Sequence, residues 1–157
     1  MLSRLAMDSG SAGFLPLVLG LMVLGTGCSG PFLLLPGGEL EGRTAATPTS
    51  WAFTDEISTI QLETDPSDPY SVNIWAVAMA DQLYLHAGGN RTTWVENIEE
   101  DKRVRVSIDG TIYELFAVRV EEAGEFGVFA DAYEAKYGRR PRNENISEIY
   151  VYRMGAR

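Results

Sequence analysis

From Trp51 to the C-terminus, apolar residues come in short runs separated by turn-forming residues, a pattern typical of a sheet-rich domain. Its clearest part lies around Asp109-Gly110, a dipeptide that strongly predicts a tight hairpin. Apolar and polar residues alternate from Arg103 to Ile108 on one side, and Ile112 to Glu121 continues as a long strand on the other. The chain is therefore predicted to be mainly β.

The run from Tyr70 to Met79 is apolar at nearly every position, so it is expected to form a central strand buried on both faces of the sheet. Ala80-Asp81-Gln82 is short enough to turn this strand back into the next one. Apolar residues at helical spacing predict a helix before the last strand. The other expected elements are strands at 57–64, 83–87 and 148–154, a short helix at 94–100 and a longer helix at 125–137.

The N-terminus resembles an export signal. Its apolar run, Phe14 to Leu24, is shorter than the roughly 20 residues that span a bilayer. The small residues before Cys28 resemble a lipobox, the site at which a lipoprotein cysteine is diacylated and the signal is removed. We expect a signal peptide over residues 1–27 and a lipid, such as palmitate, on Cys28. The alternatives are an ordinary signal peptide with an incidental cysteine, or a weak membrane helix running on to Leu35.

A lipid on Cys28 would hold the protein on the extracytoplasmic side of a membrane in the cell envelope. Ser29 resembles lipoproteins of the outer membrane, provided that the source has one. Residues 28–50 are rich in proline, glycine and small polar residues and are expected to be a tether, although Pro36 to Gly42 could pack onto the domain. Residues 51–157 are expected to form one domain. Since Cys28 is the only cysteine, no internal disulfide is expected.

Charge and composition exclude several classes of function. A net charge of −9 repels phosphate backbones, so nucleic-acid binding is not expected. The dense basic cluster Arg139-Arg140-Pro141-Arg142 is interpreted as a solvated turn, and the glutamates of residues 96–100 as a solvated helix face. The only histidine, His86, excludes a multi-histidine metal site and is interpreted as structural. No catalytic residue and no metal site is predicted.

The connection from Gly88 to Asp101 carries the most suggestive chemistry. Arg91, Thr92 and Thr93 lie between a strand end and a helix start, where a guanidinium, two hydroxyls and free amides can bind a phosphate. The alternative is that Thr92 or Thr93 only caps the helix, with Arg91 in solvent and Trp94 in the core.

The order of these motifs resembles a known family. Tyr70-Ser-Val-Asn-Ile-Trp, then Leu83-Tyr-Leu-His-Ala-Gly-Gly-Asn-Arg-Thr-Thr-Trp, then Lys102-Arg-Val-Arg-Val and Ile112-Tyr-Glu-Leu are similar to the pyridoxamine 5′-phosphate oxidase-like split β-barrels, in particular to the deazaflavin-dependent nitroreductase branch. Ala132-Tyr-Glu-Ala-Lys-Tyr resembles a helix of small relatives of that branch.

The resemblance implies a split β-barrel of six to seven strands, FMN-binding-like, with a short helix after the third strand and a longer helix before the last. It further implies a homodimer and a cofactor, FMN or a deazaflavin, at the boundary between subunits. Arg91, Thr92 and Thr93 would contact the cofactor phosphate. Asn73 would lie on the strand that faces the cofactor ring, and Trp94 would support the loop.

Three hypotheses follow for the function. The first is a flavin- or deazaflavin-dependent oxidoreductase of the envelope, in which the cofactor carries the electrons. The second is a barrel that binds a small ligand or haem without turnover. The third is an accessory lipoprotein that binds no cofactor and uses the barrel for dimer or partner contact.

Overall fold

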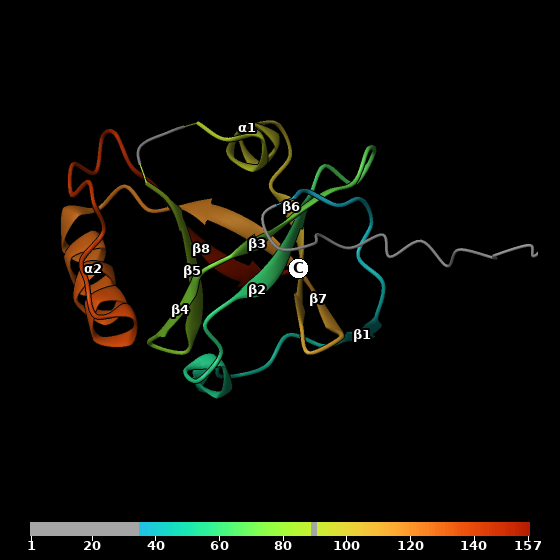
Figure 1. Cartoon of the computed structure of the whole chain (residues 1–157), viewed down its shortest axis with the longest axis horizontal. Coiled ribbons are helices and arrows are strands. Elements are labelled where there is room, and N and C mark those ends of the chain that lie inside the picture. The colour runs from blue at the N-terminus through green and yellow to red at the C-terminus, as the bar shows by residue number, and fades with distance from the viewer. Residues whose placement is uncertain (1–34, 89–90) are drawn as a thin grey trace, which may run out of the picture.

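The computed structural model describes residues 35–88 and 91–157, so the predicted signal peptide and Cys28 lie outside the described residues. An eight-stranded sheet curls around an apolar interior, with α1 at one end and α2 on one side (Figure 1). This confirms the prediction of a mainly β chain with two helices, the longer one before the last strand. The sheet has eight strands rather than six to seven, and the short helix follows the fifth strand rather than the third, because the segment at 43–45 adds a strand and the run at 70–79 forms two. The elements are β1 Arg43–Ala45, η1 Ala52–Thr54, β2 Ile60–Thr64, β3 Tyr70–Ile74, β4 Ala76–Met79, β5 Gln82–Ala87, α1 Thr93–Glu100, β6 Arg103–Ile108, β7 Thr111–Arg119, α2 Ala123–Tyr137 and β8 Tyr150–Ala156.

The sheet runs in the order β3-β2-β6-β7-β8-β5-β4, and β1 pairs with β7 outside this path. Neither α1 nor α2, nor any other helix in the described part of the chain, is long and apolar enough to cross a membrane. Both predicted hairpins are confirmed. Asp109 and Gly110 adopt positive φ angles of 48° and 74°, as a two-residue hairpin turn requires, and Ala80 and Asp81 do the same at 47° and 62°.

The predicted central strand at 70–79 is wrong. The segment forms two strands, β3 and β4, which lie at opposite ends of the sheet order, and the chain breaks between them at Trp75. The end of α2 fastens this break: Lys136 Nζ donates to the Ala76 carbonyl at 2.8 Å, and Trp75 stacks on Tyr137 with ring centroids 4.6 Å apart. An apolar run cannot distinguish one doubly buried strand from two successive half-buried ones.

Two apolar cores lie on the two sides of the sheet. The larger fills the barrel and includes Trp94, Val95 and Ile98 of α1, which therefore closes one end of it. The smaller lies beneath α2, where Phe129 and Tyr133 pack against β4, β5 and β8. His86 on β5 belongs to the side of the sheet that α2 covers, since its ring contacts both of these aromatic residues.

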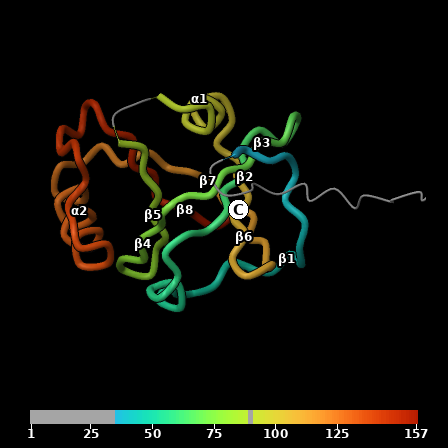
Figure 2. The backbone as a smooth tube through the Cα atoms, in the orientation of Figure 1, coloured from blue at the N-terminus to red at the C-terminus, as the bar shows by residue number. Residues whose placement is uncertain are grey.

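Part of the predicted tether packs on the domain. Gly37 and Ser71 exchange two backbone hydrogen bonds of 2.9 Å, and Leu40 is buried. A Cβ on Gly42 would lie 2.5 Å from the Gly110 carbonyl oxygen, so glycine is required where the segment crosses the β6–β7 turn. The expectation that Pro36 to Gly42 could pack is thereby met, and the packed body begins well before Trp51. Figure 2 shows this segment along the side of the barrel opposite α2.

Candidate functional site

The predicted phosphate seat lies where the connection after β5 enters α1. Arg91, Thr92 and Thr93 are all exposed, and Thr92 is the residue that precedes the helix. Its carbonyl accepts the amides of Val95 and Glu96 at 2.9 and 3.1 Å, but its side chain makes no capping hydrogen bond. Thr92 is therefore not a side-chain cap, and in the described part of the chain no side chain accepts from the first amides of α1.

Trp94 fixes the position of this helix start. Its side chain is buried, and its ring meets Tyr152 of β8 edge-on at a centroid distance of 5.8 Å. Asn97, one turn later, donates to Thr64 Oγ1 on β2 at 3.0 Å. The exposed residues at 91–93 are thus carried by a helix that is anchored to the barrel wall at two points.

Asn73 lies on β3 opposite Gln61 of β2 and is half-buried. Since side chains alternate between the two faces of a strand, Asn73 shares the outer face of β3 with Ser71, while Val72 and Ile74 face the barrel core that α1 closes. The predicted cofactor-binding residues 91–94 therefore lie together at the start of α1, and Asn73 lies apart from them on the outer face of β3.

The acidic face of α1 is not simply solvated. Tyr152 donates its hydroxyl to Glu99 at 2.5 Å, and Arg119 lies 3.9 Å from the same carboxylate. Burial, together with the carboxylate of Glu99, raises the pKa of Tyr152, so its hydroxyl stays protonated. Glu96 and Glu100 are exposed, and neither forms an ion pair with another described residue.

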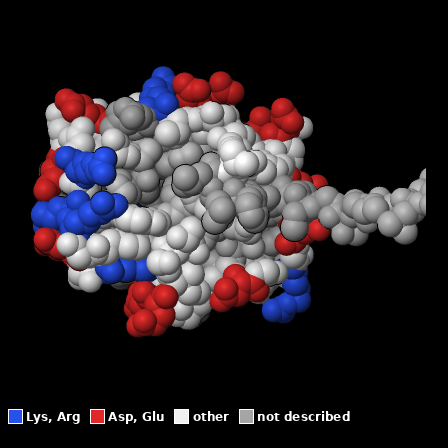
Figure 3. Space-filling view, in the orientation of Figure 1, with Lys and Arg blue, Asp and Glu red and all other residues white. Residues whose placement is uncertain are grey.

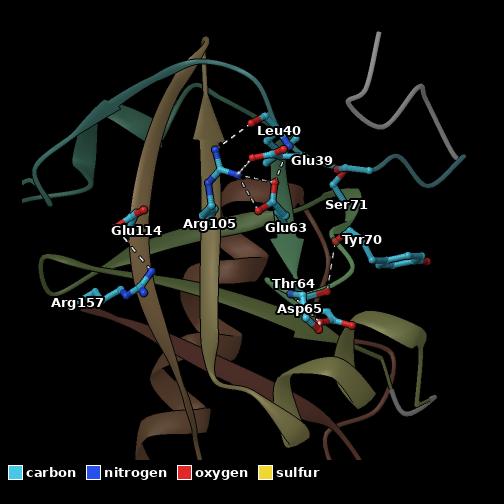
Figure 4. Close-up of polar contacts among 12 residues, drawn as sticks. Glu39, Leu40, Glu63, Thr64, Asp65, Tyr70, Ser71, Arg105, Glu114 and Arg157 are labelled. Carbon is cyan, nitrogen blue, oxygen red and sulfur yellow. Dashed lines mark hydrogen bonds and ion pairs between the residues drawn. The ribbon is translucent and has the colours of Figure 1, made fainter. Parts of the chain in front are cut away.

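A second polar centre, which the sequence analysis did not predict, lies on the opposite side of β2 (Figure 4). Arg105 Nη1 donates to both carboxylate oxygens of Glu63, at 2.9 and 3.0 Å, and Glu63 is almost fully buried. Arg105 also donates to the Leu40 carbonyl at 2.9 Å, and the Leu40 amide donates to Glu63. A cavity of about 320 Å³ adjoins this pair. In the sequence Glu63 is one of three polar residues in the five-residue strand β2, so the local pattern does not single it out.

His86, on β5, packs against α2. Its ring lies edge-on to Tyr133 at 4.7 Å and tilted against Phe129 at 5.6 Å. Burial lowers its pKa to about 4, so the imidazole is neutral at physiological pH. This agrees with the interpretation of His86 as a packed histidine, although a cavity opens beside it.

Neither a protein-family model nor a curated protein sequence matches this chain. Several solved structures, however, match its fold. A conserved hypothetical protein Rv2991 from Mycobacterium tuberculosis superposes with a TM-score of 0.54 and 20% identity, over 73% of this chain and 85% of that one. A NimC/NimA family protein from Clostridium acetobutylicum gives 0.51 and 13%, over 66% and 75% of the two chains. A protein described as a pyridoxamine 5′-phosphate oxidase from Listeria innocua gives 0.50 and 12%, over 66% and 86%.

The chain therefore has the split-barrel fold of the pyridoxamine 5′-phosphate oxidase-like proteins, as its motif order predicted. At these identities the likeness defines the fold, and one fold hosts many functions.

Proposed function

We propose that this protein is a lipoprotein of the cell envelope whose split barrel holds a phosphate-bearing cofactor of the flavin or deazaflavin class. The observation that carries the proposal is the start of α1, where Thr92 makes no side-chain capping hydrogen bond and Arg91 is exposed. A helix start with free amides and a guanidinium is a site built for an anion. The split-barrel fold supports the choice of cofactor, because a solved neighbour is described as a pyridoxamine 5′-phosphate oxidase.

In this proposal the residues of the chain bind and orient the cofactor. Arg91 would donate hydrogen bonds to the phosphate, and the hydroxyls of Thr92 and Thr93 would donate further ones. Trp94, which is buried in the barrel interior, would keep the helix start in place, and Asn73 would belong to the strand that faces the cofactor ring. The bound cofactor would supply electron or hydride transfer, and no residue of the chain is assigned a catalytic step.

The proposed cofactor site lies at the boundary of a homodimer. In the single chain Arg91 to Thr93 are open to solvent, so one chain offers only one wall for a planar ring. Phe116 and Val118 on β7 are 39% and 41% exposed, which leaves apolar surface on the outside of the barrel for a second copy. Sedimentation at micromolar concentration measures this, and a monomer would remove the dimer from the proposal.

Substituting Arg91 tests the phosphate seat. Loss of a charge-assisted contact is worth about 1.5–3 kcal/mol, so Arg91→Ala should weaken cofactor affinity roughly tenfold to hundredfold. Fluorescence titration with FMN and with a reduced deazaflavin measures the affinity of wild type and variant. Arg43→Ala, which removes an equally exposed arginine on β1, is the matched control and should bind like wild type.

Two outcomes would contradict the phosphate seat. If the wild type binds neither cofactor, the accessory lipoprotein becomes the better hypothesis, which the negative charge of the exposed Glu96 and Glu100 on α1 already favours. If wild type and Arg91→Ala bind equally, the cofactor lies elsewhere.

The lipid anchor is tested at Cys28. A single acyl chain binds membranes only marginally, whereas two or more anchor stably, so Cys28→Ala should move nearly all of the protein out of the membrane fraction or leave it unprocessed. Cell fractionation and mass spectrometry of the mature N-terminus measure this. Ser29→Ala is the control, because it leaves the acylated thiol intact. Unchanged fractionation of Cys28→Ala, without lipid on the terminus, would show that the anchor is wrong.

A further inference from the structure

A small basic cavity lies between the end of β5 and the turn that follows α2. His86 and Gly88 come from the β5 side, Tyr133 comes from α2, and Arg139, Arg140 and Arg142 come from the turn. Its volume is about 110 Å³. Figure 3 shows basic side chains grouped on the edge of the molecule where α2 lies in Figure 1. In a chain of net charge −9, such a grouping calls for a physical reason.

The position of Arg140 is explained by its ion pairs with carboxylates of the protein itself. It donates to Asp131 at 2.6 Å and to Glu134 at 3.3 Å on α2, and makes two bonds of 3.0 and 3.1 Å to Glu144. These carboxylates neutralise its charge and tie the turn to the helix. The interpretation of the turn as merely solvated is therefore wrong for Arg140, and equally for Pro141, which is buried.

Arg139 and Arg142 differ from Arg140 in this respect. Within residues 35–88 and 91–157, neither of them forms an ion pair with a carboxylate. The guanidinium of Arg139 lies over the ring of Trp75, 4.7 Å from its centroid, and also hydrogen-bonds the neighbouring Tyr133, so it is held in place by neutral groups. Two uncompensated guanidinium groups thus border one cavity.

The cavity also offers neutral hydrogen-bonding groups. His86 can donate from one ring nitrogen while uncharged, and burial raises the pKa of Tyr133 against the opposing effect of Arg139 and Arg142, so the Tyr133 hydroxyl remains a donor. The titratable or charged side chains that line the cavity are thus those of His86, Tyr133, Arg139, Arg142 and the ion-paired Arg140.

We propose that this cavity is a binding site for the phosphate group of a small phosphate monoester. Pockets that enclose whole drug-sized ligands measure about 300–1,000 Å³, so a cavity of this size takes one end of a ligand and leaves the rest outside. Two unpaired arginines match a dianion, and a phosphate monoester carries a charge of about −1.5 to −2 at pH 7. A monocarboxylate would satisfy only one of them.

This site is independent of the cofactor proposed above. It lies between β5 and the turn after α2, whereas Arg91 to Thr93 belong to the start of α1, and the two sets share no residue. Arg91→Ala should therefore leave phosphate binding here unchanged, and the failure of one proposal would not imply the failure of the other.

Titration of the full-length chain in mild detergent with inorganic phosphate and with methyl phosphate tests the site. Calorimetry gives the affinity. Tryptophan fluorescence shows whether binding occurs at this site, because Trp75 contacts Arg139. Trp75→Phe should therefore abolish the fluorescence change without abolishing the heat of binding. Arg139→Gln and Arg142→Gln should each weaken binding roughly tenfold to hundredfold. Arg43→Gln changes the net charge equally and should bind like wild type.

Arg139→Lys guards against a folding artefact, because it keeps the charge and should retain part of the affinity. Thermal unfolding of each variant checks that the barrel is intact. Equal binding of acetate, equal loss in Arg43→Gln, or no saturable binding of phosphate or methyl phosphate by the folded wild type would each overturn the proposal.

Discussion

Arg105→Ala should lower the free energy of unfolding by about 3–5 kcal/mol, because it leaves the buried Glu63 carboxylate without its ion-pair partner. The Glu63 side chain is only 4% exposed, and both of its oxygens accept from Arg105. With the guanidinium removed, the Leu40 amide is the donor that remains to this carboxylate within residues 35–88 and 91–157. Urea unfolding at pH 7 measures the loss.

The same substitution should free the N-terminal segment of the domain. Arg105 Nη2 donates to the Leu40 carbonyl at 2.9 Å, so it holds the segment from Gly37 to Ala45 as well as Glu63. Hydrogen exchange at residues 37–45 should rise more than exchange in β5 or α2. Gly37 pairs with Ser71 at the edge of β3, so the substitution should also loosen residues 37–45 from this edge.

Arg103→Ala is the matched control for Arg105→Ala. Arg103 lies two residues earlier on the same strand and pairs with Asp101, but its side chain is 46% exposed against 22% for Arg105. Exposed pairs contribute about 0–1 kcal/mol, so this variant should be close to wild type. A loss equal to that of Arg105→Ala would mean that burial of Glu63 is not the cause. The double variant Glu63→Leu with Arg105→Leu should recover most of the stability.

The second large effect is a pH dependence that originates at His86. Its pKa is about 4 in the folded chain and about 6.5 when unfolded, so the unfolded chain binds more protons between these values. The contribution of His86 to the free energy of unfolding should therefore be fully present above about pH 6.5. It should be lost as the pH drops toward 4, by on the order of 2–3 kcal/mol. Below pH 4 both states are protonated and this contribution stays constant.

His86→Phe isolates this contribution, because a phenyl ring fits the aromatic contacts with Phe129 and Tyr133 and does not titrate. Carboxylates titrate in the same range in both proteins, so the difference between the two stability curves belongs to His86. Unfolding should be measured from pH 4 to 7 in phosphate-free buffer, since an anion beside His86 would raise its pKa. Parallel curves, or an NMR titration of His86 with a midpoint near 6.5, would contradict the prediction.

The sequence alone was sufficient for elements whose signals are local. The Asp109-Gly110 turn, the alternation on β6 and the helical spacing of Phe126, Phe129 and Tyr133 on α2 are each contained in one short segment. The positions of Arg91 to Thr93 before a helix also followed from adjacent residues. What these three residues bind stays a prediction, and only their exposure and the absence of a Thr92 side-chain cap were added by the structure.

The tertiary structure alone decided everything that depends on which distant residues meet. It split the apolar run at 70–79 into strands at opposite ends of the sheet, because α2 fastens the break at Ala76 from 60 residues away. It joined Arg105 to Leu40 across 65 residues and to Glu63 across 42. It also placed His86 beside Arg139 and Arg142. Local patterns record which face of a segment is apolar, but the partner that covers that face is chosen by packing across the whole chain.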